Sequence, residues 1–381
     1  MPSRLFLFAL ALAVYFVGAT EFMLTAMLTP LALAFSTSPA AASWLVSGYA
    51  LSYAIAAPIL GILSDRIDRR RLLLASLVFF ALDGVALTFA PTFEIAVALR
   101  ILGGFASAAL IPTTFALISE TVPAERQAAA MGTAMLGMTL GIAFGPALAG
   151  LLTESFGWRA PFLATAGGCL LVFAVGLRVI PASAQHRVGV RFERAWFRNA
   201  AVLRPLLAKA GWNGAAVTAF LLTGEVLRQR YELDTGEVGL AVSAFGIGLG
   251  LGNLAIGPAS RLTGREEVVL LGATVLVAVA VVLFLLTPLP LWSAILCLLA
   301  WGLALGLAAP ASTAILARRA GARKGQVLAL SESLNNVIIL AALPAAAAML
   351  GAFGPGGIVL VLAFGLALGV GLTAADLDRA R

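Results

Sequence analysis

Hydrophobic residues occur along this chain in long blocks, and short polar segments separate the blocks. A helix needs about 20 mainly apolar residues to cross the hydrocarbon of a bilayer. By this measure the first half holds six expected helices, at 5–33, 42–63, 71–90, 93–118, 127–152 and 159–180. The second half holds six more, at 201–223, 236–259, 267–286, 289–316, 325–350 and 355–375. The pattern therefore predicts an all-α protein that crosses a membrane many times.

The first block resembles a secretory signal peptide at its start, because Arg4 precedes an apolar run. The run continues well beyond the length of a signal-peptide core, and Glu21 interrupts it. We therefore interpret this block as an uncleaved membrane helix.

One polar segment is longer than the others, and it lies near the middle of the chain at residues 181–200. Six expected helices precede it and six follow it. This arrangement is typical of two repeated halves joined by a linker. We predict a first bundle at 1–180, a linker at 181–200 and a second bundle at 201–381.

Most of the 25 Lys and Arg residues lie in loops that share one side of the membrane if the N-terminus is inside. Positive residues are retained on the cytoplasmic side. We therefore expect both termini and the linker to be cytoplasmic. The same distribution argues against nucleic-acid binding despite the net charge of +7, because the positive charges are scattered among short loops.

Composition excludes several other classes of protein. Hydrophobic residues make up 61% of the chain and charged residues only 11%, against roughly 25% charged residues in a soluble domain. The single histidine and two cysteines cannot form a metal site or a catalytic triad. No phosphate-binding loop is present. We therefore expect neither an enzyme nor a cofactor or metal.

The loop after the second expected helix reads GILSDRIDRRRLL, at residues 61–73. It resembles the signature G-x-L-A-D-R-x-G-R-[RK] of the major facilitator superfamily. The matching residues that we assign to a gating motif are Gly61, Asp65, Arg66, Arg69 and Arg70. Asp68 replaces the usual glycine, which weakens the tight-turn part of the motif. A purely topogenic role is the alternative, but a glycine and an aspartate add no positive charge.

A weak echo of this loop occurs in the second half, at 257–267. It reads GPASRLTGREE and lies about 196 positions later, with Gly257 in the place of Gly61 and Arg265 in the place of Arg69. A degenerate echo at this spacing fits a duplicated six-helix unit.

Further resemblance lies in the fourth and fifth expected helices. RILGGFASA, from Arg100, is similar to the family's R-x-x-Q-G, with Gly103 in the glutamine position. GIAFGPALAG, at 141–150, is similar to G-x-x-x-G-P-x-x-G-G, the signature of the drug:proton antiporter branch. Its matching residues are Gly141, Gly145, Pro146 and Gly150. Such a row of small residues lets another helix approach closely, and generic helix packing is the alternative reading.

The resemblance implies the major facilitator fold, in which twelve helices form two six-helix bundles around a central cavity. It also implies alternating access and the proton-coupled export of a small molecule. The first helix, GATEFMLTAMLTP at 18–30, is similar to the corresponding segment of bacterial sugar-efflux and multidrug exporters. We therefore expect a monomer in a bacterial inner membrane, with a small-molecule substrate and protons as partners and the proton gradient as energy source. A proton symporter or facilitator that imports its solute, and a membrane sensor without transport, are the alternatives.

Three ionisable residues lie deep within the expected helices of the first half, where each costs at least about 2.5 kcal/mol to insert. Glu21 and Arg100 fall at similar depths. We interpret Glu21 as the carboxylate that binds the proton and Arg100 as its counter-charge; a static ion pair is the alternative. Asp83 either joins this pair or forms a hydrogen bond within the bundle.

The second half carries a second set of buried polar residues. Lys209 and Glu332 lie at similar depths, so we expect them to pair across the cavity. Other residues that could line a substrate cavity are Tyr49, Tyr53, Trp212, Asn213, Asn335 and Asn336. For the asparagines we favour hydrogen bonding between helices, and for the two tyrosines we favour packing.

Overall fold

The computed structural model describes residues 4–63, 68–181 and 199–379. Asp65, Arg66 and most of the 181–200 segment lie outside these ranges. Within them the chain folds into helices without any β-strand. The helices of the first half are α1 (Arg4–Phe22), α2 (Leu24–Ala34), α3 (Pro39–Ala42), α4 (Trp44–Leu63), α5 (Arg69–Thr88), α6 (Phe93–Thr121), α7 (Ala124–Phe156) and α8 (Ala160–Val179).

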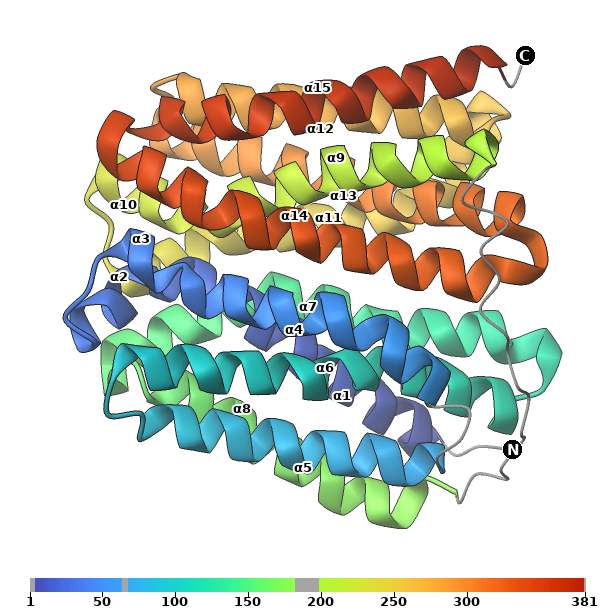
Figure 1. The fold of residues 1–381 in the computed structure, drawn as a ribbon, viewed down its shortest axis with the longest axis horizontal. Coiled ribbons are helices and arrows are strands. Elements are labelled where there is room, and N and C mark those ends of the chain that lie inside the picture. The colour runs from blue at the N-terminus through green and yellow to red at the C-terminus, as the bar shows by residue number, and fades with distance from the viewer. Residues whose placement is uncertain (1–3, 64–67, 182–198, 380–381) are drawn as a thin grey trace.

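The helices of the second half are α9 (Ala200–Leu221), α10 (Thr223–Tyr231), α11 (Thr235–Thr263), α12 (Glu266–Leu286), α13 (Leu291–Ala320), α14 (Lys324–Phe353) and α15 (Pro355–Arg379). The long helices run roughly side by side, and the two halves form two groups (Figure 1). The start of α1 and the end of α15 lie at one end of the molecule, which we call the terminal end. We call the opposite end, which carries α3 and α10, the distal end.

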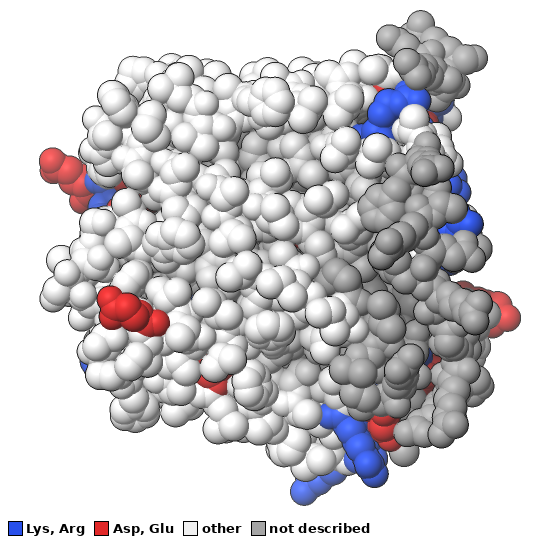
Figure 2. Space-filling view, in the orientation of Figure 1, with Lys and Arg blue, Asp and Glu red and all other residues white. Residues whose placement is uncertain are grey.

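Ten of the described helices are long and apolar enough to cross a membrane. Two more, α4 with 20 residues and α9 with 22, have the required length. The sequence of α9 is more polar because it contains Arg204, Lys209 and Asn213. Each of the twelve expected spans is therefore represented by a helix, and the predicted all-α fold class is confirmed. A broad uncharged band separates the charged residues at the two ends (Figure 2).

The first span of each half is broken, which the sequence analysis did not predict. A turn at Met23 separates α1 from α2, and a turn at Leu222 separates α9 from α10. At each turn the backbone forms a tighter bond between residues three apart, from the N–H of Ala26 to Met23 and from that of Leu222 to Ala219. The expected single helix at 5–33 was wrong, because the sequence is apolar on both sides of Met23 and gives no sign of the turn. The expected helix at 201–223 corresponds to α9, and its continuation as α10 was missed because the sequence after Leu222 is polar.

The two halves meet closely at the distal end and separate toward the terminal end. α7 packs against α11 so tightly that a methyl group added at Gly246 would overlap the backbone of Ala143. Farther along the same two helices, toward the terminal end, Gly132 and Gly257 have no neighbouring atom within 4 Å of such a methyl group. The close contact between these two helices therefore lies in their middle and distal parts.

Candidate functional site

A small cavity of about 10 Å³ lies where α1 is interrupted, between the two halves. This volume is close to the space that one water molecule needs. Its polar lining consists of Glu21, Tyr49 and Asn336, and the rest is apolar. Glu21 comes two residues before the turn at Met23. In the described part of the chain its carboxylate forms neither a hydrogen bond nor an ion pair.

Arg100, on α6, is 2% exposed and is held by neutral partners. Its Nε donates to the carbonyl of Leu45 at 3.2 Å, and its guanidinium lies 4.7 Å from the centre of the Tyr49 ring. The Tyr49 hydroxyl in turn donates to Ser107. Arg100 and Glu21 lie near enough to interact electrostatically, but they form no ion pair within 4 Å. The expected counter-charge is thus close to Glu21 without contacting it.

Asp83 on α5 occupies the place that a side chain at position 103 would take. A methyl group at Gly103 would overlap the Asp83 carboxylate. The glycine that departs from the family's R-x-x-Q-G pattern therefore makes room for this aspartate. Asp83 is close enough to Arg100 to interact with it electrostatically, and its Oδ1 has no hydrogen-bond partner among the described residues. Of the two readings of Asp83, the geometry favours the one that joins it to Arg100.

The predicted pair in the second half is confirmed. Lys209 Nζ lies 3.0 Å from Glu332 Oε1 and donates to the Thr313 hydroxyl at 3.3 Å. The lysine side chain is 4% exposed, whereas that of Glu332 is 48% exposed. The cation is therefore buried between α9, α13 and α14, and the carboxylate is half-exposed.

The remaining predicted cavity residues differ in their surroundings. The Asn213 amide donates to Asn335 at 2.9 Å, so this pair joins α9 to α14. Asn336 lines the small cavity, while Tyr53 is half-buried beside Tyr49, with ring centres 6.4 Å apart. Trp212 is completely buried and packs against α15. No surface of Trp212 faces the cavity in this conformation.

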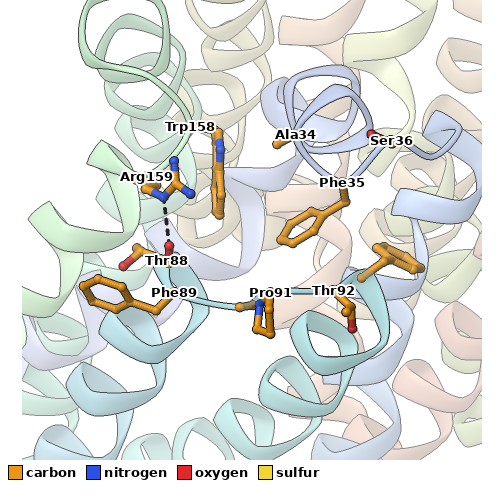
Figure 3. Close-up of a pocket in the computed structure, with 11 residues that line it drawn as sticks. Ala34, Phe35, Ser36, Thr88, Phe89, Pro91, Thr92, Trp158 and Arg159 are labelled. Carbon is orange, nitrogen blue, oxygen red and sulfur yellow. Dashed lines mark hydrogen bonds between the residues drawn. The ribbon is translucent and has the colours of Figure 1, made fainter.

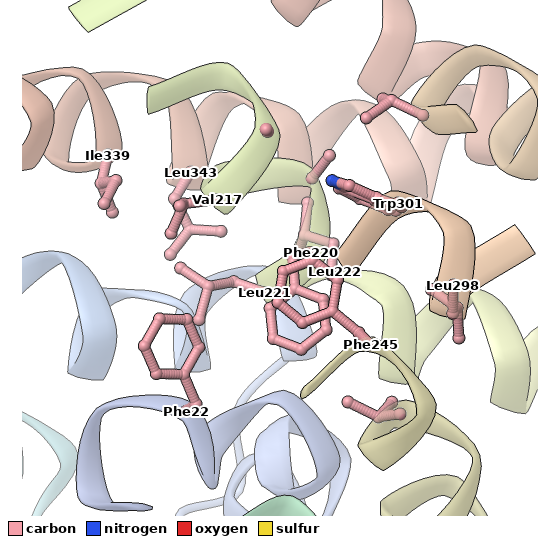
Figure 4. Packing of buried hydrophobic residues seen from close by; sticks show 14 of the residues in the cluster. Phe22, Val217, Phe220, Leu221, Leu222, Phe245, Leu298, Trp301, Ile339 and Leu343 are labelled. Carbon is pink, nitrogen blue, oxygen red and sulfur yellow. The ribbon is translucent and has the colours of Figure 1, made fainter. Parts of the chain in front are cut away.

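An apolar layer closes the distal side of the cavity (Figure 4). Phe22, next to Glu21, lies 5.8 Å from Phe220, measured between ring centres. Phe220 stacks on Phe245 at 3.8 Å and meets Trp301 edge-on at 6.2 Å. Phe22 and Phe220 thus meet between the halves, with Phe245 and Trp301 packed behind Phe220, and this layer separates Glu21 from the distal end.

The glycine motif at 141–150, which lies on α7, positions α1 and also contacts the other half. Gly141 and Gly145 lie against the backbone of α1 near Tyr15 and Ala19, and Gly150 lies against the start of α11. The predicted close approach of a neighbouring helix is confirmed. Its consequence is that α7 connects the helix that carries Glu21 to the interface between the halves.

The gating motif is described only in part, because Asp65 and Arg66 lie outside the described ranges. Gly61 lies in the last turn of α4. Arg69 pairs with Glu120 at 2.6 Å, and Arg70 donates to the carbonyl of Leu177. The departure at Asp68 has a structural explanation. Its φ is −55°, outside the left-handed region, and its side chain caps α5 by accepting the N–H of Arg71. An aspartate therefore suits this position.

A larger cavity, of about 630 Å³, lies at the distal end of the first half (Figure 3). Trp158 and Phe35 form its walls, and Arg159 donates from Nε to the carbonyl of Thr88 at 2.8 Å. The guanidinium lies 4.6 Å from the centre of the Trp158 ring. Its lining comes from loops at the helix ends, so this cavity is separate from the central site.

Sequence reasoning missed three residues that join the halves at the distal end. Glu225 contacts Thr29, and Glu154 contacts the start of α11. Glu225 was missed because the seventh span was expected to end at 223. One signal could have found it: Thr29 and Glu225 are 196 positions apart. This equals the spacing between the gating motif and its echo, so the two residues occupy equivalent places in the repeats.

The fold and the buried polar residues between two helical halves define a multi-pass membrane transporter. The model of the Major Facilitator Superfamily matches the chain over residues 10–227 and again over 213–377. The chain therefore belongs to the major facilitator superfamily, whose members are membrane transporters rather than enzymes.

Curated relatives include transport and resistance proteins. The chain is 30% identical to the inner membrane transport protein YdhP of Escherichia coli over 65% of its length, and it spans 64% of that relative. It is 28% identical to a chloramphenicol resistance protein of Streptomyces lividans, covering 70% of this chain and 68% of the relative. It is 34% identical to the multidrug efflux pump LfrA of Mycolicibacterium smegmatis, covering 49% and 38%.

Solved structures support the fold. A D-xylose–proton symporter matches with a TM-score of 0.79 and 18% identity, covering 97% of this chain and 96% of the other. An inward-facing, occupied bacterial homologue of the lysosomal transporter Spinster matches with a TM-score of 0.70 and 19% identity, covering 98% and 94%. At these identities the likeness concerns the fold alone.

Proposed function

We propose that this protein exports a small amphipathic molecule in exchange for protons. The observation that carries the proposal is Glu21, a carboxylate between the two halves that has no hydrogen-bond or ion-pair partner among the described residues. An unpaired carboxylate in a membrane is costly, and such residues commonly bind protons or ligands. The efflux proteins among the relatives and the glycine motif at 141–150 support export over import.

Alternating access would follow from rocking of the two halves. In the observed state the close contacts between the halves lie in the middle and distal parts of α7 and α11, so we infer that the site opens toward the terminal end, which positive-inside topology makes cytoplasmic. Substrate would enter from this side and displace the proton from Glu21 by competing for the same cavity. The distal side would then open, release the substrate and admit a proton from outside. The proton gradient supplies the energy, and coupling arises because the two ligands favour different states.

The proposal also includes the location and the oligomeric state of the protein. A bacterial inner membrane, cytoplasmic termini and a monomeric protein without cofactor or nucleic-acid partner fit the sequence and the relatives. The cavity walls near Glu21 combine Tyr49 and Asn336 with aliphatic and aromatic side chains. This lining suits an amphipathic molecule that is neutral or cationic.

The test is uptake into inverted membrane vesicles under an imposed pH gradient, with a panel of lipophilic cations, neutral antibiotics and sugars. We expect gradient-dependent uptake of a panel member by the unmodified protein and its loss in Glu21→Gln. Uptake that depends neither on the gradient nor on Glu21 would indicate a facilitator instead. Accumulation only with the gradient reversed would identify a symporter.

A further inference from the structure

At the distal end, two carboxylates each accept a hydrogen bond from a backbone N–H of the other half. Glu225, on α10, is 3% exposed. Its Oε1 accepts the backbone N–H of Thr29 at 3.0 Å, and the Thr29 hydroxyl lies 2.9 and 2.7 Å from its two oxygens. The second half thus binds a backbone amide of the first. α2 and α10 are in close contact here, because a methyl group at Gly224 would overlap the carbonyl of Thr25.

Glu154 makes the reciprocal contact from the first half to the second. Its Oε2 accepts the backbone N–H of Gly236 at 2.8 Å. Gly236 lies in the first turn of α11, where helix N–H groups lack partners and the helix end is positive. We call Glu154, Glu225 and their two backbone partners the distal clasp.

No cation neutralises the clasp within the described residues, since neither carboxylate forms an ion pair within 4 Å. Of the helices packed against α10, α2 carries no charge. Arg228, on α10 itself, donates to the carbonyl of Leu233 and to the Thr235 hydroxyl. The buried carboxylate of Glu225 therefore depends on hydrogen bonds that exist only while the halves touch, whereas Glu154 is exposed.

The other charged groups nearby are engaged elsewhere. At the start of α11, Asp234 and Glu237 bond to each other's backbone N–H. In α9 the buried Lys209 is paired with Glu332. On the side of α7, Arg159 donates to a carbonyl at the end of α5. Glu225 is thus held by its Thr29 contacts rather than by a neighbouring charge.

We propose that the distal clasp is the outer gate of the transporter, and that protonation of Glu225 releases it. This inference rests on the proposed transport function. A proton from the water at the distal end would bind one Glu225 oxygen and turn it from an acceptor into a donor. The hydrogen bonds to the hydroxyl and the amide of Thr29 would then lose the negative charge that strengthens them, and this weaker contact would allow α10, a short segment beyond the break at Leu222, to move.

The distal clasp lies between Glu21 and the distal end, so its opening would affect how protons reach Glu21. Thr29 lies eight residues beyond Glu21, which corresponds to about 12 Å along a helix. Glu225 is therefore placed between Glu21 and the distal water, beyond the apolar layer around Phe220. Opening of the clasp by an external proton would give Glu21 access to the same proton supply.

The test is the distance between spin labels across the distal end in lipid nanodiscs, measured by double electron–electron resonance. Labels at Thr37→Cys and Pro288→Cys report one half each, and both native cysteines are buried. We expect one short distance at about pH 8 and a second, longer distance whose population grows as the pH is lowered to about 4, because a free glutamate carboxyl binds its proton near pH 4.3. Glu225→Gln and Thr29→Val should each show the longer distance already at pH 8, with about a tenfold rise in its population.

Two further variants sharpen the test. Glu154→Gln should open the distal end partly, because it weakens the second contact of the clasp. Glu232, an exposed carboxylate at the end of α10, provides the matched control. Glu232→Gln removes a charge from the same helix without touching the clasp, so it should behave as the unmodified protein.

Unchanged distances in both Glu225→Gln and Thr29→Val would overturn the proposal. So would a full pH response in Glu225→Gln, since the response would then belong to another group. The measurement needs neither substrate nor gradient, so its failure is distinguishable from failure of the proposed transport function.

Discussion

Each half of the molecule buries a cation near its centre, but only the second half pairs it with a carboxylate. Lys209 contacts Glu332 and Thr313. In the first half Arg100 is held by an aromatic ring and a carbonyl, and Glu21 remains without a partner among the described residues. A charge that is fixed by a partner stabilises one arrangement. An unpaired carboxylate stays available to bind a proton or a cationic group, which is why we assign coupling to the first half.

The two halves also differ in how these helices are supported. The backbone of α1 lies against Gly141 on α7, and α7 continues into the interface with α11. The backbone of α9 lies against Gly365 on α15, within its own half. Movement of one half relative to the other therefore reaches Glu21 more directly than it reaches Lys209.

The largest effect on stability should follow from Arg100→Ala. The substitution leaves Asp83 buried without its nearby cation, and stranding a buried charge costs about 3 kcal/mol. The midpoint temperature of thermal unfolding in detergent should fall accordingly. Adding Asp83→Asn should recover part of the loss, because the stranded charge is removed. Strictly additive losses in the double variant would show that the two side chains are independent.

A smaller effect should distinguish the two members of the second pair. Glu332→Ala strands Lys209, which is 4% exposed, and should cost about 2 kcal/mol, less than a fully buried pair because Glu332 is half in water. Lys209→Met leaves only the accessible carboxylate and should cost about 1 kcal/mol or less. Thermal unfolding of the two variants provides the comparison. Equal losses would contradict the assignment of the lysine as the buried member.

The support of α1 can be tested with two glycines of the same helix. A methyl group at Gly141 would overlap the backbone of α1 near Tyr15, whereas one at Gly132 meets no atom within 4 Å. We expect Gly141→Ala to cost about 1–2 kcal/mol and to slow transport. Gly132→Ala should be neutral or slightly stabilising, because alanine favours helix. Equal behaviour of both variants would remove the argument from close packing.

Much of the fold could be predicted from the sequence because hydrophobic length and loop charge act locally. The twelve spans, the glycine contacts of α7 and the Lys209–Glu332 pair follow from such rules. The break at Met23 could not be predicted, since an apolar residue inside an apolar run carries no local signal. The helical segment after Leu222 was missed for the opposite reason, because its polar sequence marked the end of the expected span.

Other features depend on contacts between distant parts of the chain. Glu225 contacts Thr29 only because the halves close at the distal end, and Gly103 is explained only once Asp83 is seen beside it. Asp68 appeared to weaken the gating motif, yet it caps α5 because its backbone is not left-handed. The roles of Glu21 and Arg100 remain predictions.

The central claim is that the unpaired carboxylate of the first half, rather than the paired one of the second, exchanges the proton. Proton release on substrate binding tests it most directly, measured with a pH indicator on purified protein in weakly buffered detergent solution. The account predicts release from the unmodified protein and from Glu332→Gln, and none from Glu21→Gln. Release that persists in Glu21→Gln and disappears in Glu332→Gln would contradict it.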